Sequence, residues 1–205
     1  MEPSQKAADI IWLDRAESTN RSVRELSGRL DNLSVIAAYE QTAGRGQGTH
    51  SWHSTPGANL TFSILLRPRN LMARDLLLIT CATTLGIRDY MLEHGVEARI
   101  KWHNDIWVGM RKICGILIEN VLDGEMIAES IIGIGLNINE TDWPPELPNP
   151  VSLKQLTGKD YDPREELPLL HTKICRRFAQ LDSDTGRSEL QEEFGKYVFR
   201  LPSEP

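Results

Sequence analysis

The feature that most constrains the fold is a pair of long apolar segments joined by a tight turn. Residues 112–121 and 126–138 are rich in isoleucine, a β-branched residue that favours strands. Asp123-Gly124 lies between them, and these two residue types tolerate the positive φ angles that a two-residue hairpin turn requires. The two segments therefore predict a long antiparallel hairpin.

Other parts of the chain predict a sheet around this hairpin, with helices before and after it. Strand-like segments are expected at 33–39, 59–66, 98–102 and 106–108. Helical spacing of apolar residues predicts helices at 18–30, 73–93, 163–181 and 188–194. Strands that follow one another in a run, flanked by helices, indicate an α+β fold with a mixed, mostly antiparallel sheet rather than a doubly wound sheet.

Composition excludes several classes of protein. The 205 residues suffice for one large domain, and the formal net charge of −6 argues against a general nucleic-acid binder. No apolar run reaches the ~18 residues that a membrane span needs, and the N-terminus lacks a secretory apolar region. Three widely spaced cysteines predict reduced thiols in a cytoplasmic protein rather than disulfides or a zinc site.

His94 and His171 are expected to be solvent-facing helix residues.

The first functional candidate is the glycine-rich segment 41–52, which contains Gly44, Arg45 and Gly46. Glycines allow backbone N–H groups to approach a phosphate, and an arginine between them adds a charged donor. The segment matches neither a P-loop nor a dinucleotide fingerprint. It is either a phosphate-binding loop or a mobile surface loop.

The second candidate is Lys112, which stands at the start of an apolar strand and follows the segment 101–105. A lysine at that place can neutralise a carboxylate or a phosphate, with Asp105 as its counter-charge. An ordinary surface lysine after a turn is the alternative.

Two further segments contain polar residues or glycines in a suggestive position. Gly133 and Gly135 interrupt an apolar strand, which indicates either close approach of a ligand or a tight crossing within the sheet. Asn137 follows them and is suited to an amide or purine edge. Residues 18–20 fit a helix N-cap that also offers hydrogen bonds to a polar ligand.

Six motifs, taken in order over about residues 10–140, resemble the catalytic domain of biotin–protein ligases. They are Glu17-Ser18-Thr19-Asn20, Gln41-Thr42-Ala43-Gly44-Arg45-Gly46-Gln47 with Trp52, Pro56-Gly57-Ala58-Asn59-Leu60, Lys101-Trp102-His103-Asn104-Asp105, Lys112-Ile113-Cys114-Gly115-Ile116-Leu117-Ile118-Glu119 and Gly133-Ile134-Gly135-Leu136-Asn137. The resemblance implies a fold similar to class II aminoacyl-tRNA synthetases. It also implies two reactions: biotin and Mg-ATP form biotinyl-5′-AMP and pyrophosphate, and a lysine of a biotin carboxyl carrier protein domain of a carboxylase then takes the biotin.

The resemblance also assigns roles to residues. It implies that Lys112, Arg45 and Asp105 are catalytic, and that Mg²⁺ arrives with ATP rather than on a metal site of the chain. Biotin-binding positions are implied at Ser18, Thr19, Asn20, Gln41, Gly44, Arg45, Gly46, Gln47, Trp52, Lys112 and Gly115. Adenylate-binding positions are implied at Arg45, Trp52, Asn104, Lys112 and Asn137. Trp52 is expected either to stack on the biotin tail or to pack the closed loop.

The chain departs from the family's pattern at some positions. His103 stands where the family usually has proline, and Gln47 stands where some members have arginine. The catalytic pattern begins almost at once, so no repressor domain is expected before it. We expect a catalytic domain over 1–190 and a tail over 191–205 that is the stub of an absent SH3-like domain.

Two other functions fit the same motifs. A lipoate–protein ligase shares the fold and the adenylation chemistry, although the tryptophan-bearing loop and the segment 101–105 favour biotin. A non-catalytic biotin binder is the other alternative, and the presence of Arg45, Asp105 and Lys112 argues against it. A homodimer is possible, whereas nucleic-acid and membrane partners are not expected.

Overall fold

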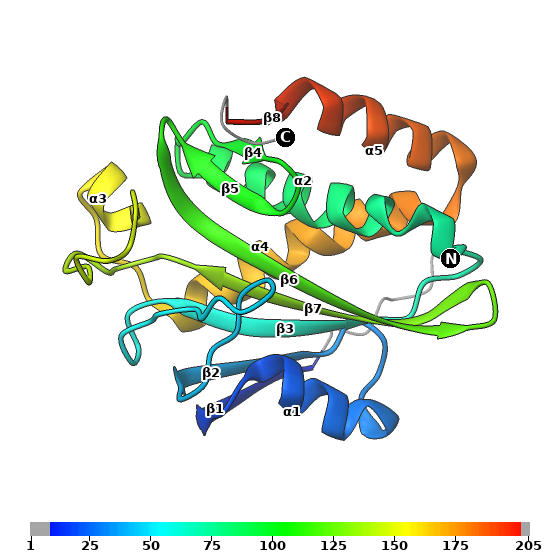
Figure 1. The fold of residues 1–205 in the computed structure, drawn as a ribbon, viewed down its shortest axis with the longest axis horizontal. Coiled ribbons are helices and arrows are strands. Elements are labelled where there is room, and N and C mark those ends of the chain that lie inside the picture. The colour runs from blue at the N-terminus through cyan, green and yellow to red at the C-terminus, as the bar shows by residue number, and fades with distance from the viewer. Residues whose placement is uncertain (1–8, 202–205) are drawn as a thin grey trace.

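A computed structural model describes residues 9–201 and has one eight-stranded sheet at its centre (Figure 1). The strands are β1 (Ile10–Ala16), β2 (Val35–Gln41), β3 (Leu60–Leu66), β4 (Arg99–Lys101), β5 (Asp105–Val108), β6 (Arg111–Asp123), β7 (Met126–Leu136) and β8 (Val198–Phe199). Their spatial order is β1-β2-β3-β7-β6-β5-β4-β8. The β1–β2 and β4–β8 pairs are parallel and the others are antiparallel, which confirms the predicted mixed sheet.

The predicted hairpin consists of the two longest strands of the sheet. Strands β6 and β7 pair along most of their length and turn at Gly124, which has a φ of +58°. Glycine has no Cβ to clash in this left-handed conformation, which is why the turn forms at Asp123-Gly124.

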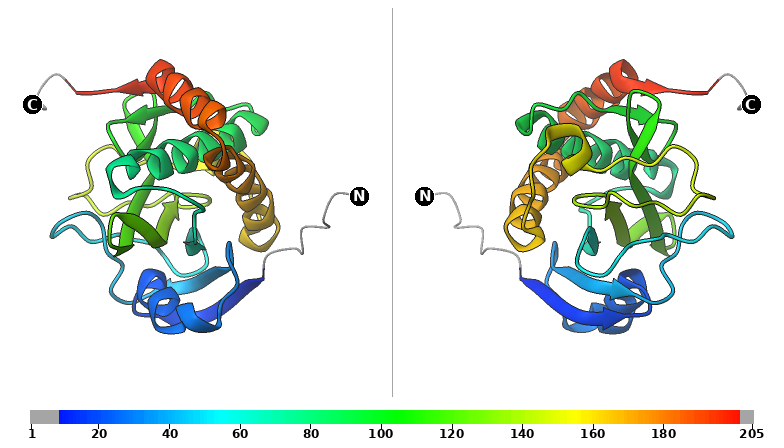
Figure 2. Two further views of the ribbon diagram at one scale, coloured as in Figure 1. Left: turned by 90° about the vertical axis from the view of Figure 1, so that its right-hand side faces the viewer. Right: turned by 90° about the vertical axis from the view of Figure 1, so that its left-hand side faces the viewer.

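Helices cover both faces of the sheet. The helices are α1 (Thr19–Leu26), α2 (Leu77–Glu93), α3 (Leu153–Thr157), α4 (Pro163–Ala179) and α5 (Asp184–Tyr197), with short 3₁₀ turns at Ser27–Arg29, Ala73–Asp75 and Gln180–Asp182. Helices α2, α4 and α5 lie on one face of the sheet (Figure 2). Their buried side chains form the main core with that face. Helix α1 packs on the opposite face, where Val23 contributes to a small second core.

Three elements were not predicted from the sequence, and each is short or lies at an edge of the sheet. Strand β1 is partly exposed, and its short apolar run ends after Leu13 because Asp14 and Arg15 follow. Helix α3 has only five residues and forms around a capping box between Ser152 and Gln155. Strand β8 has two residues, and its pairing with β4 joins distant parts of the chain.

The expectation that His94 and His171 face solvent is wrong. His171 is only 7% exposed and is one of the buried residues of α4. Its Nε2 lies 3.0 Å from the carbonyl oxygen of Leu33. The His94 ring packs edge-on against Tyr90 and Tyr161 and forms a 3.2 Å contact with Glu166.

Within residues 9–201, none of the helices combines the length and the apolar character needed to cross a bilayer.

Candidate active site

A cavity of about 600 Å³ lies on the face of the sheet that carries α1. Strand alternation sends large apolar side chains such as Phe62 and Ile132 into the main core on the other face. The intervening residues of β6 and β7 that face the cavity include Gly115, Gly133 and Gly135. Because these three glycines have no side chains, they leave space for the cavity on this face of the sheet.

Most of the predicted site residues line this one cavity. Those that line it are Ser18, Thr19, Asn20, Gln41, Arg45, Gly46, Gln47, Trp52, Asn104, Asp105, Lys112 and Gly115. They come from α1, the end of β2, the glycine-rich loop, β5 and β6. Folding thus brings together segments separated by almost one hundred residues, as the 3.3 Å hydrogen bond from Asn20 Nδ2 to the Leu117 carbonyl oxygen shows.

Trp52 fills the part of the cavity above two glycines. Gly115 and Gly135 are paired across β6 and β7, and a Cβ on Gly135 would lie only 2.2 Å from Cε2 of the indole. A Cβ on Gly115 would lie 2.8 Å from Cζ3 of the same ring. Among the described residues, none bonds to the buried Nε1 of Trp52. The close approach predicted at Gly135 is therefore made by a side chain of the glycine-rich loop, whereas a Cβ on Gly133 would lie 2.2 Å from Asn20 Oδ1 of α1.

Lys112 lies beside this tryptophan and forms an ion pair with Asp105. Lys112 Nζ is 2.8 Å from Asp105 Oδ1 and 5.8 Å from the centroid of the Trp52 ring. The Lys112 backbone is fixed on its other side, because its N–H donates to the Asn149 carbonyl oxygen and its own carbonyl accepts from Val151. This arrangement confirms that Asp105 is the counter-charge of Lys112.

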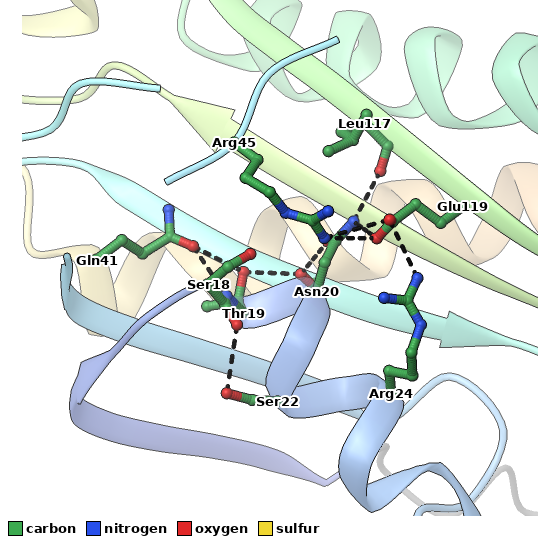
Figure 3. Close-up of polar contacts among 10 residues, drawn as sticks. Ser18, Thr19, Asn20, Ser22, Arg24, Gln41, Arg45, Leu117 and Glu119 are labelled. Carbon is green, nitrogen blue, oxygen red and sulfur yellow. Dashed lines mark hydrogen bonds and ion pairs between the residues drawn. The ribbon is translucent and has the colours of Figure 1, made fainter. Parts of the chain in front are cut away.

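A chain of hydrogen bonds runs through the α1 side of the cavity (Figure 3). Thr19 N–H donates to Gln41 Oε1 at 2.9 Å. The fully buried Ser63 hydroxyl lies 2.7 Å from Thr19 Oγ1 and 2.6 Å from Asn20 Oδ1. Ser18 is the N-cap residue of α1, as expected, but its side chain makes no capping hydrogen bond. Its hydroxyl is therefore not committed to the helix end.

Glu119 is the last residue of this series of hydrogen bonds, and it was not assigned a role from the sequence. Its carboxylate accepts hydrogen bonds from Asn20 Nδ2 at 2.8 Å and from Arg45 Nη2 at 3.1 Å, and Arg24 Nη2 lies 3.1 Å away. Burial alone would raise the pKa of Glu119, but the bonds from Asn20 and Arg24 and the charges of both arginines outweigh it and lower the pKa. One signal was present in the sequence, namely a charged residue inside the apolar run of β6.

Two predicted site residues do not line the cavity. Gly44 serves the loop, because its carbonyl accepts from Trp52 N–H and a Cβ at Gly44 would lie 2.6 Å from the Trp52 carbonyl oxygen. Asn137 lies beyond the end of β7, where its Nδ2 donates to the Val151 carbonyl oxygen at 3.0 Å. Within residues 9–201 its buried Oδ1 has no hydrogen-bond partner. The structure does not bring Asn137 to the cavity.

The cavity also has a wall that was not predicted. Trp102, Trp107 and Leu201 line it. The Trp102 N–H donates to the Phe199 carbonyl oxygen at 2.8 Å, and the Arg200 guanidinium lies 4.5 Å from the centre of the Trp102 ring. The end of the described chain is therefore part of the cavity wall, a contact that no local pattern in the sequence could reveal.

The donor groups at the cavity indicate how a metal ion would be held there. Over the described part of the chain, no three side chains of the histidine, cysteine, aspartate or glutamate types are grouped to hold one. Mg²⁺ usually keeps several waters and binds through substrate phosphates with one or two carboxylates. Asp105 is the carboxylate nearest to Lys112 in the cavity. The residues present therefore suit an ion that arrives bound to a nucleotide.

The sequence matches known proteins over most of its length. Residues 12–137 match the model of the biotin/lipoate A/B protein ligase family. The chain is 34% identical over 180 residues to a biotin–[acetyl-CoA-carboxylase] ligase of Paracoccus denitrificans, covering 83% of this chain and 73% of that protein. It is 32% identical over 157 residues to the bifunctional ligase/repressor BirA of Bacillus subtilis, covering 75% of this chain. That match includes 48% of BirA, so the chain spans about half the length of this relative.

Solved structures have the same fold. The biotin protein ligase of Aquifex aeolicus in complex with biotin and ATP superimposes with a TM-score of 0.80 at 26% identity, covering 93% of this chain and 78% of that one. The ligase of Leishmania major in complex with biotinyl-5-AMP gives a TM-score of 0.72 at 26% identity, with coverages of 96% and 87%. The chain belongs to the biotin/lipoate A/B protein ligase family.

Proposed function

We propose that this chain is the catalytic domain of an ATP-dependent biotin–protein ligase. One observation carries the proposal most directly: the Lys112–Asp105 ion pair and the hydrogen-bonding groups of residues 18–20 line the same cavity. An acid-activating enzyme needs a cation at the reacting carboxylate and neutral donors for the rest of the acid. The names of the Paracoccus denitrificans and Aquifex aeolicus relatives support biotin as that acid.

In the first reaction, a biotin carboxylate oxygen attacks the α-phosphorus of Mg-ATP, an O–P bond forms, and the bond to pyrophosphate breaks. Two anions must meet, and negative charge increases at the phosphoryl oxygens during the reaction. Lys112 offsets this repulsion from a fixed position because Asp105 holds its ammonium group. Arg45, on the loop at the cavity, adds a second cation for the phosphate.

The α1 side of the cavity suits the ureido ring of biotin, which is neutral and both donates and accepts hydrogen bonds. Thr19 and Gln41 are already oriented by their own bond, and the Ser18 hydroxyl is not used in capping. The indole of Trp52 offers an apolar surface for the biotin tail next to Lys112.

In the second reaction, a lysine amine of a carrier protein attacks the carbonyl carbon of biotinyl-5′-AMP and AMP leaves. The carrier that we propose is a biotin carboxyl carrier domain of acetyl-CoA carboxylase or a related carboxylase, as the name of the Paracoccus denitrificans relative suggests. We further propose that the catalytic unit extends beyond residue 190 to Leu201. Helix α5 runs through that boundary, and Leu201 lines the cavity.

The test is biotin-dependent release of pyrophosphate from Mg-ATP, with lipoate as a parallel substrate and with a carrier domain present or absent. The proposal predicts release with biotin, none with lipoate, and a carrier that becomes reactive to streptavidin. Release with lipoate alone would instead assign the chain to the lipoate-specific branch of the family, and silence with both acids would favour a binding protein.

A further inference from the structure

The carboxylate of Glu119 is shared by three side chains from two other parts of the chain (Figure 3). Arg45 comes from the glycine-rich loop, and Asn20 and Arg24 come from α1. The Glu119 side chain is 23% exposed, whereas those of Arg24 and Arg45 are about half exposed, at 50% and 47%. The strand residue is therefore the fixed partner, and the long arginine side chains are held by it.

Geometry shows which part of Arg45 is committed to this contact. Within residues 9–201, the hydrogen bonds of the Arg45 guanidinium to Glu119 use Nη2 alone, at 3.1 and 3.2 Å. Because a guanidinium is planar and rigid, fixing one nitrogen directs the N–H groups of the other two. Arg45 also lines the cavity, so its orientation there depends on Glu119.

A carboxylate near a site for phosphates would normally repel the ligand. Here two arginines share one carboxylate, so the group of three keeps a net positive charge. Arg24 does not line the cavity, and it therefore offsets the charge of Glu119 without contacting a ligand there. The positive charge of Arg45 therefore remains available to a phosphate in the cavity.

We propose that Glu119 is a positioning residue for adenylation, which fixes Arg45 through Nη2 so that its remaining N–H groups face the phosphate of the adenylate. The inference rests on the proposed function, because it needs a phosphate at this cavity. Glu119 acts through Arg45 and does not itself touch the substrate.

The test is a double-mutant cycle with Glu119→Gln and Arg45→Gln, read by biotin-dependent ATP–pyrophosphate exchange. Glutamine keeps an oxygen that accepts from Asn20 but loses the charge that holds Arg45. We expect E119Q alone to lower kcat about tenfold while the KM for biotin changes less than about twofold. In the R45Q background, E119Q should lower kcat less than about twofold, because the residue through which it acts is gone.

Glu25→Gln is the matched control, since Glu25 is an arginine-paired carboxylate on the exposed side of α1. Thermal unfolding of each variant checks the fold, and Glu119→Asp replaces E119Q in the same cycle if E119Q does not fold. Equal losses from E119Q with and without Arg45 would overturn the inference, as would E119Q activity equal to that of E25Q. If the wild-type chain shows no exchange, the proposed function fails and this inference fails with it.

Discussion

Gly115 of β6 lies directly opposite Gly135 of β7, and together they form a slot in the sheet that holds an indole ring. Neither glycine has a positive φ, so neither is needed for backbone conformation. Both are needed for space, because a Cβ at either position would overlap the ring of Trp52. The slot holds the loop tryptophan next to Lys112, at a ring-to-Nζ distance of 5.8 Å.

Gly135→Ala is expected to displace Trp52 from this slot. The new Cβ would lie 2.2 Å from Cε2 of the ring, which is closer than any tolerated contact. We predict that the Kd for biotin, measured by calorimetry, rises about tenfold, which corresponds to an overpacking cost at the low end of about 1–3 kcal/mol.

Gly195→Ala on α5 is the control for this substitution, because a Cβ there meets nothing within 4 Å. It should leave biotin affinity unchanged and stabilise the helix by about 0.5–1 kcal/mol. Unchanged affinity in both variants would show that the slot does not hold the tryptophan in the working enzyme.

Ser63→Ala tests the hydrogen-bond chain behind residues 18–20. The buried hydroxyl lies within 2.7 Å of Thr19 Oγ1 and Asn20 Oδ1, so its removal leaves buried polar atoms with fewer partners. We expect the free energy of unfolding in urea to fall by about 1–3 kcal/mol and biotin affinity to fall with it. Ser130→Ala removes another buried serine, whose hydroxyl bonds to Asn120 Oδ1, and should lower stability alone. Equal biotin affinities in the two variants would contradict the account.

Stability should decrease as the pH falls toward the pKa of His171. Burial lowers the pKa of this histidine, and the carbonyl of Leu33 opposes that effect only in part. The folded protein therefore binds fewer protons than the unfolded chain just below about pH 6.5, so the stabilisation is present above that pH and is lost as the pH falls through the folded-state pKa. His171→Gln should show a smaller drop in unfolding free energy between about pH 7 and pH 5 than the wild type. An identical drop in both proteins would count against this assignment.

Removing residues 198–205 should damage both stability and the cavity. The deletion removes the Phe199 carbonyl that accepts from Trp102 and the Leu201 side chain that lines the cavity. A loss of about 1–3 kcal/mol in unfolding free energy is expected, together with weaker biotin binding. A chain that ends at Leu201 retains these contacts and is the control. The prediction fails if the two shortened chains bind biotin equally well.

Local patterns were sufficient to predict most of the sheet. Apolar runs rich in isoleucine and the Asp123-Gly124 turn specify β6 and β7 from local sequence alone. Edge strands give a weaker signal. The apolar run of β1 has only four residues before Asp14 and Arg15, and β8 depends on pairing with β4, about one hundred residues earlier. Such pairing is decided by the tertiary fold rather than by local sequence.

In the candidate site too, local motifs indicated some residues, whereas contacts between distant segments could not be predicted. Motif resemblance indicated the glycine-rich loop, Lys112 and Asp105, and the fold places all of them at one cavity. It did not reveal that Glu119 joins Arg24, Arg45 and Asn20, because these contacts cross the molecule. Asn137 has the residue type for an adenine contact, and the sequence did not reveal that its Nδ2 donates to the Val151 carbonyl oxygen.

The central claim is that Lys112, held by Asp105, activates biotin in this cavity. The most direct measurement is the rate of biotinyl-5′-AMP formation in a single turnover, for the wild type and for Lys112→Ala, with biotin binding measured in parallel. We predict that the variant still binds biotin but forms the adenylate at least about one hundred times more slowly, a cost typical of losing one electrostatic contact to the transition state. Adenylate formation at the wild-type rate by Lys112→Ala would contradict the account.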